Sequence, residues 1–240
     1  AGIARFAVYE DMLYASTWAN GTEIFRTNDG VNWEPFVEAG LNGDANNVSA
    51  ISSEIYNGYL YWGVANWASG AQLWKTDGIG FDPVFIECSI SSYKYAVSSL
   101  ASFNSYLYAS LVNDNEIEVF RSNDDIHWES ILLISDLGSS ANSKASLEVL
   151  NNELLLAAQN SNTGLEVWRT NDGTLWEQVG YEGFGDGNNE STYWDNAIAV
   201  FNNKLHIGTR NYVNGGEIWR YEKSETKIYL PLMMNNCQAH

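Results

Sequence analysis

The chain has 240 residues, of which 45% are hydrophobic and 14% aromatic, which is enough for a packed core and excludes an intrinsically disordered protein. Thirty acidic against twelve basic residues give a formal charge of -18, which would repel a phosphate backbone, so nucleic acid is excluded as a partner. No run of eighteen apolar residues is present, so no membrane-spanning helix is predicted.

One pattern occurs five times along the chain. It begins with a short apolar strand that starts at Leu13, Leu60, Leu107, Leu154 and Leu205, so the starts lie 47, 47, 47 and 51 residues apart. A second strand follows in every copy, with an acidic or amide residue, an apolar pair and a cation. The cations of the five copies are Arg26, Lys75, Arg121, Arg169 and Arg220.

A turn rich in Asn, Asp and Gly follows the second strand in four copies. These residue types adopt the left-handed backbone of tight turns, so each turn is predicted to close a hairpin. The turn aspartates are Asp29, Asp77, Asp124 and Asp172. A further strand begins at the aromatic residue after the turn, and another apolar strand precedes each Leu strand. Each copy is therefore predicted to contain four antiparallel strands.

Four antiparallel strands repeated every 40 to 50 residues or so are typical of β-propeller blades. We therefore predict an all-β fold, a five-bladed β-propeller that forms one domain over residues 1–240. The predicted blades cover residues 4–46, 47–93, 94–142, 143–192 and 193–232. The last copy lacks the Asp turn, so residues 226–240 are predicted to supply its outer strand and a tail. Pro231 cannot donate a ladder hydrogen bond, which suits an edge strand.

The turn at residues 170–176, Thr-Asn-Asp-Gly-Thr-Leu-Trp, and its copies at Thr27 and Ser122 resemble the Asp-box of sialidase-type and related secreted bacterial β-propeller proteins. The Asp-box is a hairpin of Ser or Thr, any residue, Asp, any residue, Gly, two residues and an aromatic residue. The turn at residues 170–176 departs from it because Gly follows Asp directly. The resemblance implies a propeller fold. It implies no activity, because the Asp-box of those proteins is a structural turn far from the active site.

Few lysines and many Asn, Ser, Thr, Gly and Trp residues indicate a secreted, extracellular protein, as do three N-glycosylation sequons. The sequons lie at Asn20, Asn47 and Asn189. The chain starts at Ala1 without an initiator Met or a signal-peptide pattern, which we interpret as a processed end.

No catalytic residues are predicted. A sialidase-like hydrolase would need three arginines that bind one carboxylate, a Tyr–Glu pair and an acid. The repeat cations instead occupy one equivalent position, where we expect them to pair with carboxylates of turns or neighbouring blades. Only Arg5 and Arg210 lie outside the repeat, and the histidines lack metal-site spacing. The chain is therefore predicted not to be an enzyme, and a sialidase-like glycoside hydrolase is the third hypothesis.

The loops after the Leu strands carry asparagines and aromatic residues. Aromatic faces stack on sugar rings and amides bond hydroxyl groups, so these loops form a candidate glycan site. Asparagine amides also cap loops without any ligand. The candidate residues are Trp18, Asn66, Trp67, Asn113, Asn160, Asn211 and Tyr212. A carbohydrate-binding lectin is therefore the alternative function.

One loop offers oxygen ligands for a cation. Asp186, Asn188 and Glu190 alternate along the chain, as ligands of Ca²⁺ do, and residues 44–47 form a similar loop. Neither loop completes an EF-hand, and a polar turn is the simpler interpretation. No other cofactor is predicted.

The C-terminal tail and the two cysteines suggest assembly. Cysteines in a disulfide need Cα atoms within about 7 Å, and the two are predicted in blades that are not neighbours, so a bridge between chains is one hypothesis and unpaired or locally bridged cysteines are the other. The apolar tail could also add as a strand to another copy. The assembly residues are Cys88, Ile228, Tyr229, Leu230, Leu232 and Cys237. The main prediction is a non-enzymatic extracellular structural protein that self-assembles into a fibre or surface layer.

Overall fold

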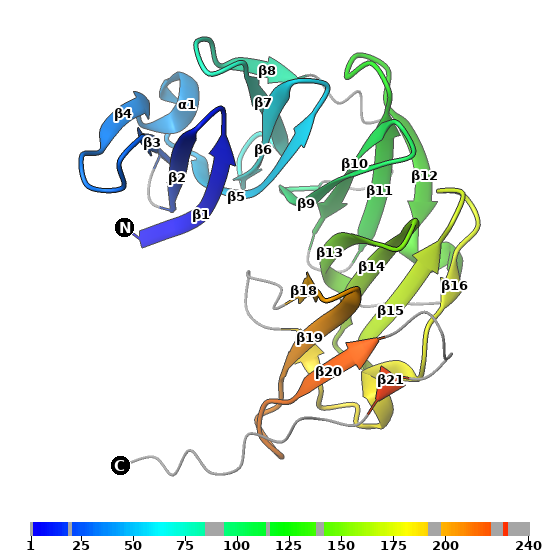
Figure 1. Ribbon diagram of the computed structural model, residues 1–240. Coiled ribbons are helices and arrows are strands. Elements are labelled where there is room, and N and C mark those ends of the chain that lie inside the picture. The colour runs from blue at the N-terminus through cyan, green and yellow to red at the C-terminus, as the bar shows by residue number, and fades with distance from the viewer. Residues whose placement is uncertain are drawn as a thin grey trace, which may run out of the picture. The chain divides into compact units, whose positions relative to one another are not determined.

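A computed structural model (Figure 1) describes residues 2–18, 21–84, 94–113, 116–137, 142–191, 198–221 and 228–229. The sites predicted at Asn20, Cys88, Leu230, Leu232 and Cys237 lie outside these residues. The chain divides into two compact units. The first comprises residues 1–113 and 118–131, and the second comprises residues 114–117 and 132–240.

The described strands of the first unit form one 12-stranded antiparallel network. It consists of three groups of four strands, one for each copy of the repeat, and we call each group a sheet. Single pairings, of Trp18 with Ser49 and of Ala65 with Ala96, join the groups. The first sheet contains β1 (Gly2–Tyr9), β2 (Met12–Trp18), β3 (Ile24–Thr27) and β4 (Glu34–Val37). The second contains β5 (Asn47–Tyr56), β6 (Tyr59–Asn66), β7 (Gln72–Thr76) and β8 (Asp82–Val84). The third contains β9 (Ala96–Phe103), β10 (Tyr106–Val112), β11 (Ile117–Ser122) and β12 (Glu129–Leu133). The helix α1 (Gly40–Gly43) links the first sheet to the second.

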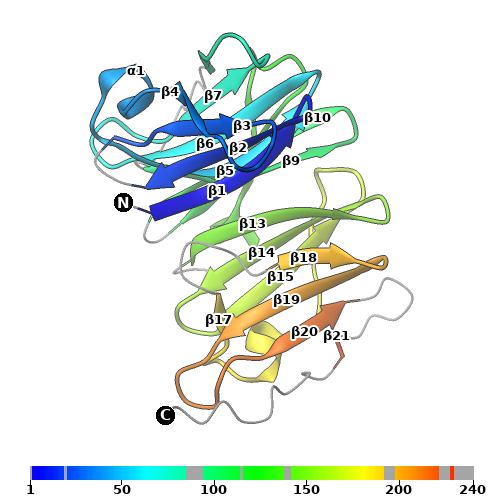
Figure 2. The ribbon, with the colours of Figure 1, turned by 60° about the vertical axis from the view of Figure 1, so that its left-hand side comes forward.

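The described part of the second unit contains two further sheets, whose strands lie side by side in Figure 2. One contains β13 (Asn142–Leu150), β14 (Glu153–Asn160), β15 (Gly164–Thr170) and β16 (Glu177–Gln178). The other contains β17 (Glu190–Ser191), β18 (Ile198–Phe201), β19 (Lys204–Arg210), β20 (Ile218–Tyr221) and β21 (Ile228–Tyr229). The 3-10 helices are η1 (Ile134–Leu137) and η2 (Glu182–Gly185). β21 pairs with β20 at the sheet edge, where the sequence predicts the outer strand.

The fold is an all-β propeller fold, as the sequence predicts. Its sheets follow the repeat strand by strand, because each Leu strand pairs with the apolar strand before it and the cation-bearing strand after it. Among the described strands no pairing closes a sheet on itself. A ring of five blades in one domain therefore stays a prediction.

One tyrosine position ties successive sheets of the first unit together. Tyr9 ends β1 and donates its hydroxyl hydrogen to the carbonyl of Gly58, while Tyr56 ends β5 and donates to the carbonyl of Ser105 at 2.7 Å. Both acceptors lie in two-residue hairpin turns. Asn57 and Gly58 have φ values of 47° and 79°, as type I′ turns require. The same contact therefore repeats from one sheet to the next.

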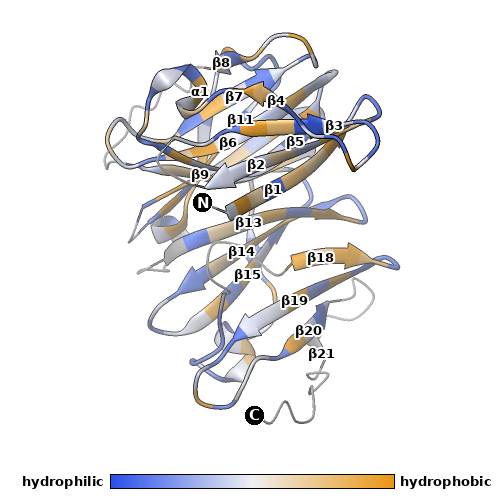
Figure 3. Ribbon diagram, turned by 90° about the vertical axis from the view of Figure 1, so that its left-hand side faces the viewer, coloured by the Kyte–Doolittle hydropathy of each residue, from blue (hydrophilic) through white to orange (hydrophobic). Residues whose placement is uncertain are grey.

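The hydrophobic core lies between neighbouring sheets. In the first unit, Tyr14 and Ile24 of the first sheet pack with Leu60 and Trp62 of the second in one buried cluster. Figure 3 shows hydrophobic and hydrophilic stretches along the strands. Because each sheet buries its faces against its neighbours, strand ends and loops remain to carry polar and aromatic groups. No helix in the described residues has the length and hydropathy needed to cross a membrane.

Candidate functional site

Polar side chains of β1 and β9, the first strands of the first and third sheets, contact two consecutive residues of β5, the first strand of the second sheet. Glu54 of β5 accepts hydrogen bonds from the Ser102 hydroxyl at 2.6 Å and from the Ser102 backbone N–H at 3.2 Å. Arg5 of β1 donates from Nε to the hydroxyl of Ser53, the neighbour of Glu54, at 3.3 Å. We call Arg5, Ser53, Glu54 and Ser102 the first-strand cluster. It combines a carboxyl group with a guanidinium and two hydroxyls.

The carboxyl of Glu54 holds its proton more tightly than an ordinary glutamate. Burial raises its pKa, and this effect outweighs the hydrogen bonds from Ser102 and the charge of Arg5, which lower it. The carboxyl thus stays protonated to a higher pH than usual. A carboxyl group in this state can donate a proton to a bound ligand.

Exposed aromatic rings lie at one end of the same sheets. Trp18 ends β2 with 60% of its surface exposed, and Trp67 follows β6 with 47% exposed. The ring of Trp67 stacks on that of Tyr95, with centroids 4.0 Å apart and planes 26° apart. Tyr95 is buried and therefore holds Trp67 in place. We call the exposed rings of Trp18 and Trp67 the aromatic platform, of which Trp67 has a stacking partner that fixes its ring.

The predicted asparagines have structural partners. Asn66 is fully buried, and its amide nitrogen donates to Asp44 at 3.0 Å and to Asn47 at 2.8 Å. Asn211 is also buried, and its amide nitrogen donates to Asp186 at 2.9 Å. Asn160 is buried and donates to Glu166, whereas Asn113 is half-buried. The structure therefore gives three of these amides a loop-capping role and leaves the rings as the accessible groups.

In the second unit, Tyr212 is a predicted ligand-binding residue with an exposed aromatic ring. Its ring is 83% exposed, and the guanidinium carbon of Arg210 lies 4.9 Å from the ring centroid. Arg210 also pairs with Glu190. The aromatic ring is thus available to solvent beside a neutralised cation.

The residues predicted to bind Ca²⁺ point to different partners. The carboxylate of Asp186 accepts hydrogen bonds from the backbone N–H of Asn188 at 2.9 Å and from the amides of Asn211 and Asn214. These donors lower the pKa of Asp186 to about 2, so it stays ionised. Glu190 instead pairs with Arg210. Within the described residues no group of three or more His, Cys, Asp or Glu side chains could hold a metal ion.

Two of the predicted glycosylation sites are buried. Asn47 and Asn189 are both fully buried, and their amide nitrogens donate to the carbonyls of Gly40 at 2.9 Å and Gly183 at 3.0 Å. A glycan is attached through that nitrogen. The folded chain leaves no room for a glycan at either residue.

The repeat cations form ion pairs in four copies. Arg26, Arg121 and Arg169 each donate from Nε to a glutamate on the adjacent strand at 2.6 to 2.7 Å. Lys75 reaches the next sheet and contacts Asp125 at 2.8 Å. Arg220 lies on β20. In these four copies the repeated cation position links strands or sheets.

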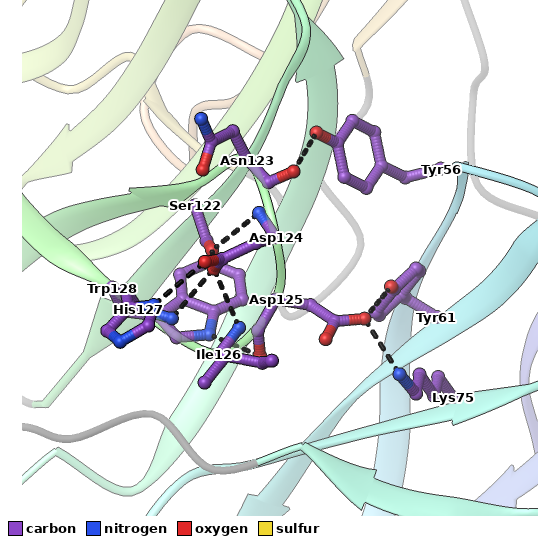
Figure 4. Close-up of polar contacts among 10 residues, drawn as sticks. All are labelled: Tyr56, Tyr61, Lys75, Ser122, Asn123, Asp124, Asp125, Ile126, His127 and Trp128. Carbon is purple, nitrogen blue, oxygen red and sulfur yellow. Dashed lines mark hydrogen bonds and ion pairs between the residues drawn. The ribbon is translucent and has the colours of Figure 1, made fainter.

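The third Asp turn departs from the others at Asp125 (Figure 4). Gly30 and Gly173 occupy the equivalent position with φ values of 74° and 81°, and Asp125 adopts φ 56°. The carboxylate of Asp125 accepts hydrogen bonds from Lys75 and from the hydroxyl of Tyr61 (Figure 4). Burial and the bond to Asp125 raise the pKa of Tyr61. A strained backbone position therefore supports a polar link between two sheets.

The predicted turn aspartates hold their turns by accepting backbone hydrogen bonds. In the fourth copy Asp172 Oδ1 accepts from the N–H groups of Thr174 at 2.8 Å and Leu175 at 2.9 Å, and Asp29 does the same in the first copy. These donors lower the pKa of Asp172. Asp77 and Asp124 accept equivalent bonds in the second and third copies.

Asp172→Asn is expected to lower stability at neutral pH, and the difference from wild type should shrink in acid. Because the pKa of Asp172 is depressed by folding, its contribution is complete above its unfolded pKa of about 4 and is lost as the pH falls toward the folded value. Urea unfolding at several pH values measures this, with Asp136→Asn, an exposed aspartate of η1, as the control. A difference that stays constant in acid would contradict the assignment.

Glu54 and Ser102 belong to no motif in the sequence and were not predicted as site residues. The signal was present, because the strand pairing places Ala7 and Ala101 of the first and third copies at the repeat position that Glu54 occupies in β5. The fourth copy has Glu148 there, so a glutamate at this position distinguishes the second and fourth copies from the first and third. Such differences between copies, rather than the repeated residues, indicate candidate functional groups.

No family model and no curated protein match the chain. Solved structures do match. A Trypanosoma rangeli sialidase in complex with 2,3-difluorosialic acid has a TM-score of 0.63 and 11% identity, over 91% of this chain and 46% of the sialidase. A Cellvibrio cellulosa α-L-arabinanase complexed with arabinohexaose has a TM-score of 0.55 and 13% identity, over 96% and 95% of the two chains. A Bombyx mori GH32 β-fructofuranosidase has a TM-score of 0.54 and 10% identity, over 97% and 62%.

These matches show the fold. The chain spans about half the length of the sialidase, and the identities are too low to transfer any activity. They nevertheless correct the main functional prediction. Sialidases and family-43 glycoside hydrolases share the fold, so the fold gives no support to a non-enzymatic, self-assembling structural protein. The prediction of a fibre subunit that is not an enzyme is therefore wrong, because it rested on the absence of one sialidase residue set.

Proposed function

We propose that the chain is a glycoside hydrolase that binds an oligosaccharide and uses Glu54 as the proton donor. The observation that carries this proposal is the half-buried carboxyl of Glu54, with its raised pKa and the hydrogen bonds from Ser102 that fix its orientation. Protonation of the leaving oxygen by a carboxyl group of raised pKa is the acid step of glycoside hydrolysis. Arg5 supplies a positive charge close to that step.

The fold supports this proposal. Its solved neighbours include a sialidase with a bound difluorosialic acid and an arabinanase with bound arabinohexaose. Both structures hold a sugar ligand on a fold like this one. We extend from them only the substrate class, a glycoside, to this chain.

The geometry of β5 favours an oligosaccharide over a single sugar. Ser49 pairs with Trp18 near the aromatic platform, and Glu54 lies five positions further along the same strand. At roughly 3.3 Å per strand residue, about 16 Å separates the two positions. An oligosaccharide spans this distance and a single sugar does not. Oligosaccharides should therefore be better substrates than aryl monoglycosides.

Trp67→Ala is expected to weaken oligosaccharide binding about three- to tenfold, since one aromatic stacking contact is lost. Tyr95 already fixes the ring of Trp67, so little ordering is needed on binding. Titration calorimetry with the best substrate measures the change. The control is Trp33→Ala, an aromatic residue of similar exposure in the first Asp turn. Equal losses in both variants would show that Trp67 is not part of the site.

The function is tested with a panel of sialylated, arabinose-containing, xylose-containing and fructose-containing oligosaccharides. Release of new reducing ends by the wild-type chain supports the proposal. Binding without release would show that the chain is a carbohydrate-binding protein and not a hydrolase. The absence of both binding and release would overturn the proposal. Secretion is a further proposal that rests on composition, and its test is the presence of the protein in culture medium.

A further inference from the structure

The fourth copy of the repeat contains a cavity. It has a volume of about 210 Å³ and lies between the start of β14 and the turn that joins β15 to β16. Glu153, Arg169, Asn171, Trp176 and Glu177 line it. None of these residues belongs to the first-strand cluster or the aromatic platform, so the cavity is separate from the site proposed for hydrolysis.

The cavity arises where the fourth copy departs from the repeat. In the second and third copies the cation stacks on a tyrosine: Lys75 lies 4.9 Å from the ring centroid of Tyr59, and Arg121 lies 4.5 Å from that of Tyr106. The fourth copy has Glu153 at this position, the first residue of its Leu strand. The side chain of glutamate is smaller than that of tyrosine. The space beside Arg169 that a ring would fill is therefore open.

The charges of the cavity wall are paired with one another. Arg169 donates to Glu177 at 2.7 Å and to the hydroxyl of Tyr221 at 2.6 Å, and its Nη1 lies 3.7 Å from a carboxylate oxygen of Glu153. The side chain of Glu153 is 8% exposed and that of Glu177 is 66% exposed. An anion entering the cavity would meet two carboxylates, and a cation would meet the guanidinium. A neutral ligand is repelled by neither the carboxylates nor the guanidinium.

An indole of the wall has an unused donor. The buried Nε1–H of Trp176 has no hydrogen-bond partner among the described residues. In the third copy the equivalent Trp128 donates to the carbonyl of Asp125 at 3.2 Å. Because this N–H is closed to solvent, the indole offers a ligand in the cavity its ring rather than this donor.

We infer that this cavity is a binding site for one neutral sugar ring. A pyranose has an apolar face that can pack on the indole of Trp176, and hydroxyl groups that can donate to carboxylates and accept from a guanidinium or an amide. A volume of about 210 Å³ is enough for one sugar ring. The cavity belongs to the second unit, whereas the first-strand cluster belongs to the first.

The test observes the indole N–H of Trp176 by NMR. D-glucose, D-galactose, D-mannose and N-acetyl-D-glucosamine are titrated separately into the full chain, and Trp176→Phe assigns the resonance. One sugar is expected to shift this resonance with a dissociation constant on the order of 1 mM. Glu153→Tyr restores the ring of the second and third copies and should abolish the shift. Trp33→Ala should leave it unchanged.

A second variant guards against misfolding. Glu177→Ala alters an exposed side chain and should weaken binding about tenfold, as the loss of one charge-assisted hydrogen bond does. The inference is overturned if no sugar shifts the Trp176 resonance. It is also overturned if Glu153→Tyr and Glu177→Ala both bind sugar like wild type and thermal unfolding shows that both variants are folded. Hydrolysis of oligosaccharides is measured separately, so failure of this site and failure of the proposed function are distinguishable.

Discussion

Glu54→Gln should lower the rate of oligosaccharide hydrolysis by about 10²- to 10⁴-fold, the usual contribution of a general acid. Glutamine keeps the shape of the side chain and can still accept the hydrogen bonds of Ser102, but it has no acidic proton. Wild-type activity should fall as the pH rises through the raised pKa of Glu54, because the donor is then deprotonated. Initial rates across the pH range should show this fall in wild type and its absence in the variant.

Stability measurements separate this effect from unfolding. Burial raises the pKa of Glu54, so its ionisation costs stability as the pH rises through the folded value. Glu54→Gln should therefore be at least as stable as wild type at neutral pH. Glu129→Gln, at an exposed glutamate, is the matched control for the loss of one charge. If Glu54→Gln retains full activity, Glu54 is not the proton donor.

Asp125→Ala should destabilise the chain by about 2–3 kcal/mol, because it leaves Lys75 and Tyr61 without their shared acceptor. The side chains of Lys75 and Asp125 are 24% and 15% exposed, so water recovers part of the loss. Asp125→Gly removes the same carboxylate but relieves the strain of φ 56°, which is worth about 1 kcal/mol. It should therefore be more stable than Asp125→Ala. Urea unfolding at pH 7 gives both free energies.

A double-mutant cycle completes this prediction. Lys75→Met combined with Asp125→Ala should cost less than the sum of the single variants, since residues in contact are not additive. Additive losses would show that the ion pair between Lys75 and Asp125 does not contribute to stability. A glycine variant no more stable than the alanine variant would show that the backbone of residue 125 carries no strain.

Most of the fold could be predicted from the sequence. Because the Leu strands and the Asp turns recur with fixed spacing, strand order and hairpin positions follow from local patterns, as in the pairing of Leu13 with Thr27 and of Leu60 with Thr76. The closure of the ring could not be predicted in this way, since it depends on contacts between the ends of the chain rather than within a copy.

The site was harder to predict, because burial decides what a polar residue does. Asn66 lies in a predicted ligand-binding loop and Asn47 in a predicted sequon. Both side chains are buried and hydrogen-bonded to one another. Glu54 lies in an ordinary strand without a motif, and only its partners on the neighbouring sheets distinguish it. Glu153 is visible as a break in the repeat, yet the sequence does not show whether another side chain fills the space.

The hydrogen bonds of Tyr9 and Tyr56 limit how far the effect of a substitution spreads through the first unit. Each joins a sheet only to the next one, so in the first unit cooperativity passes between nearest neighbours, as in a one-dimensional array. A change confined to one copy then perturbs an adjacent sheet and little beyond it. Such modularity lets a single copy acquire a new surface or lose an old one while the remaining copies keep the architecture.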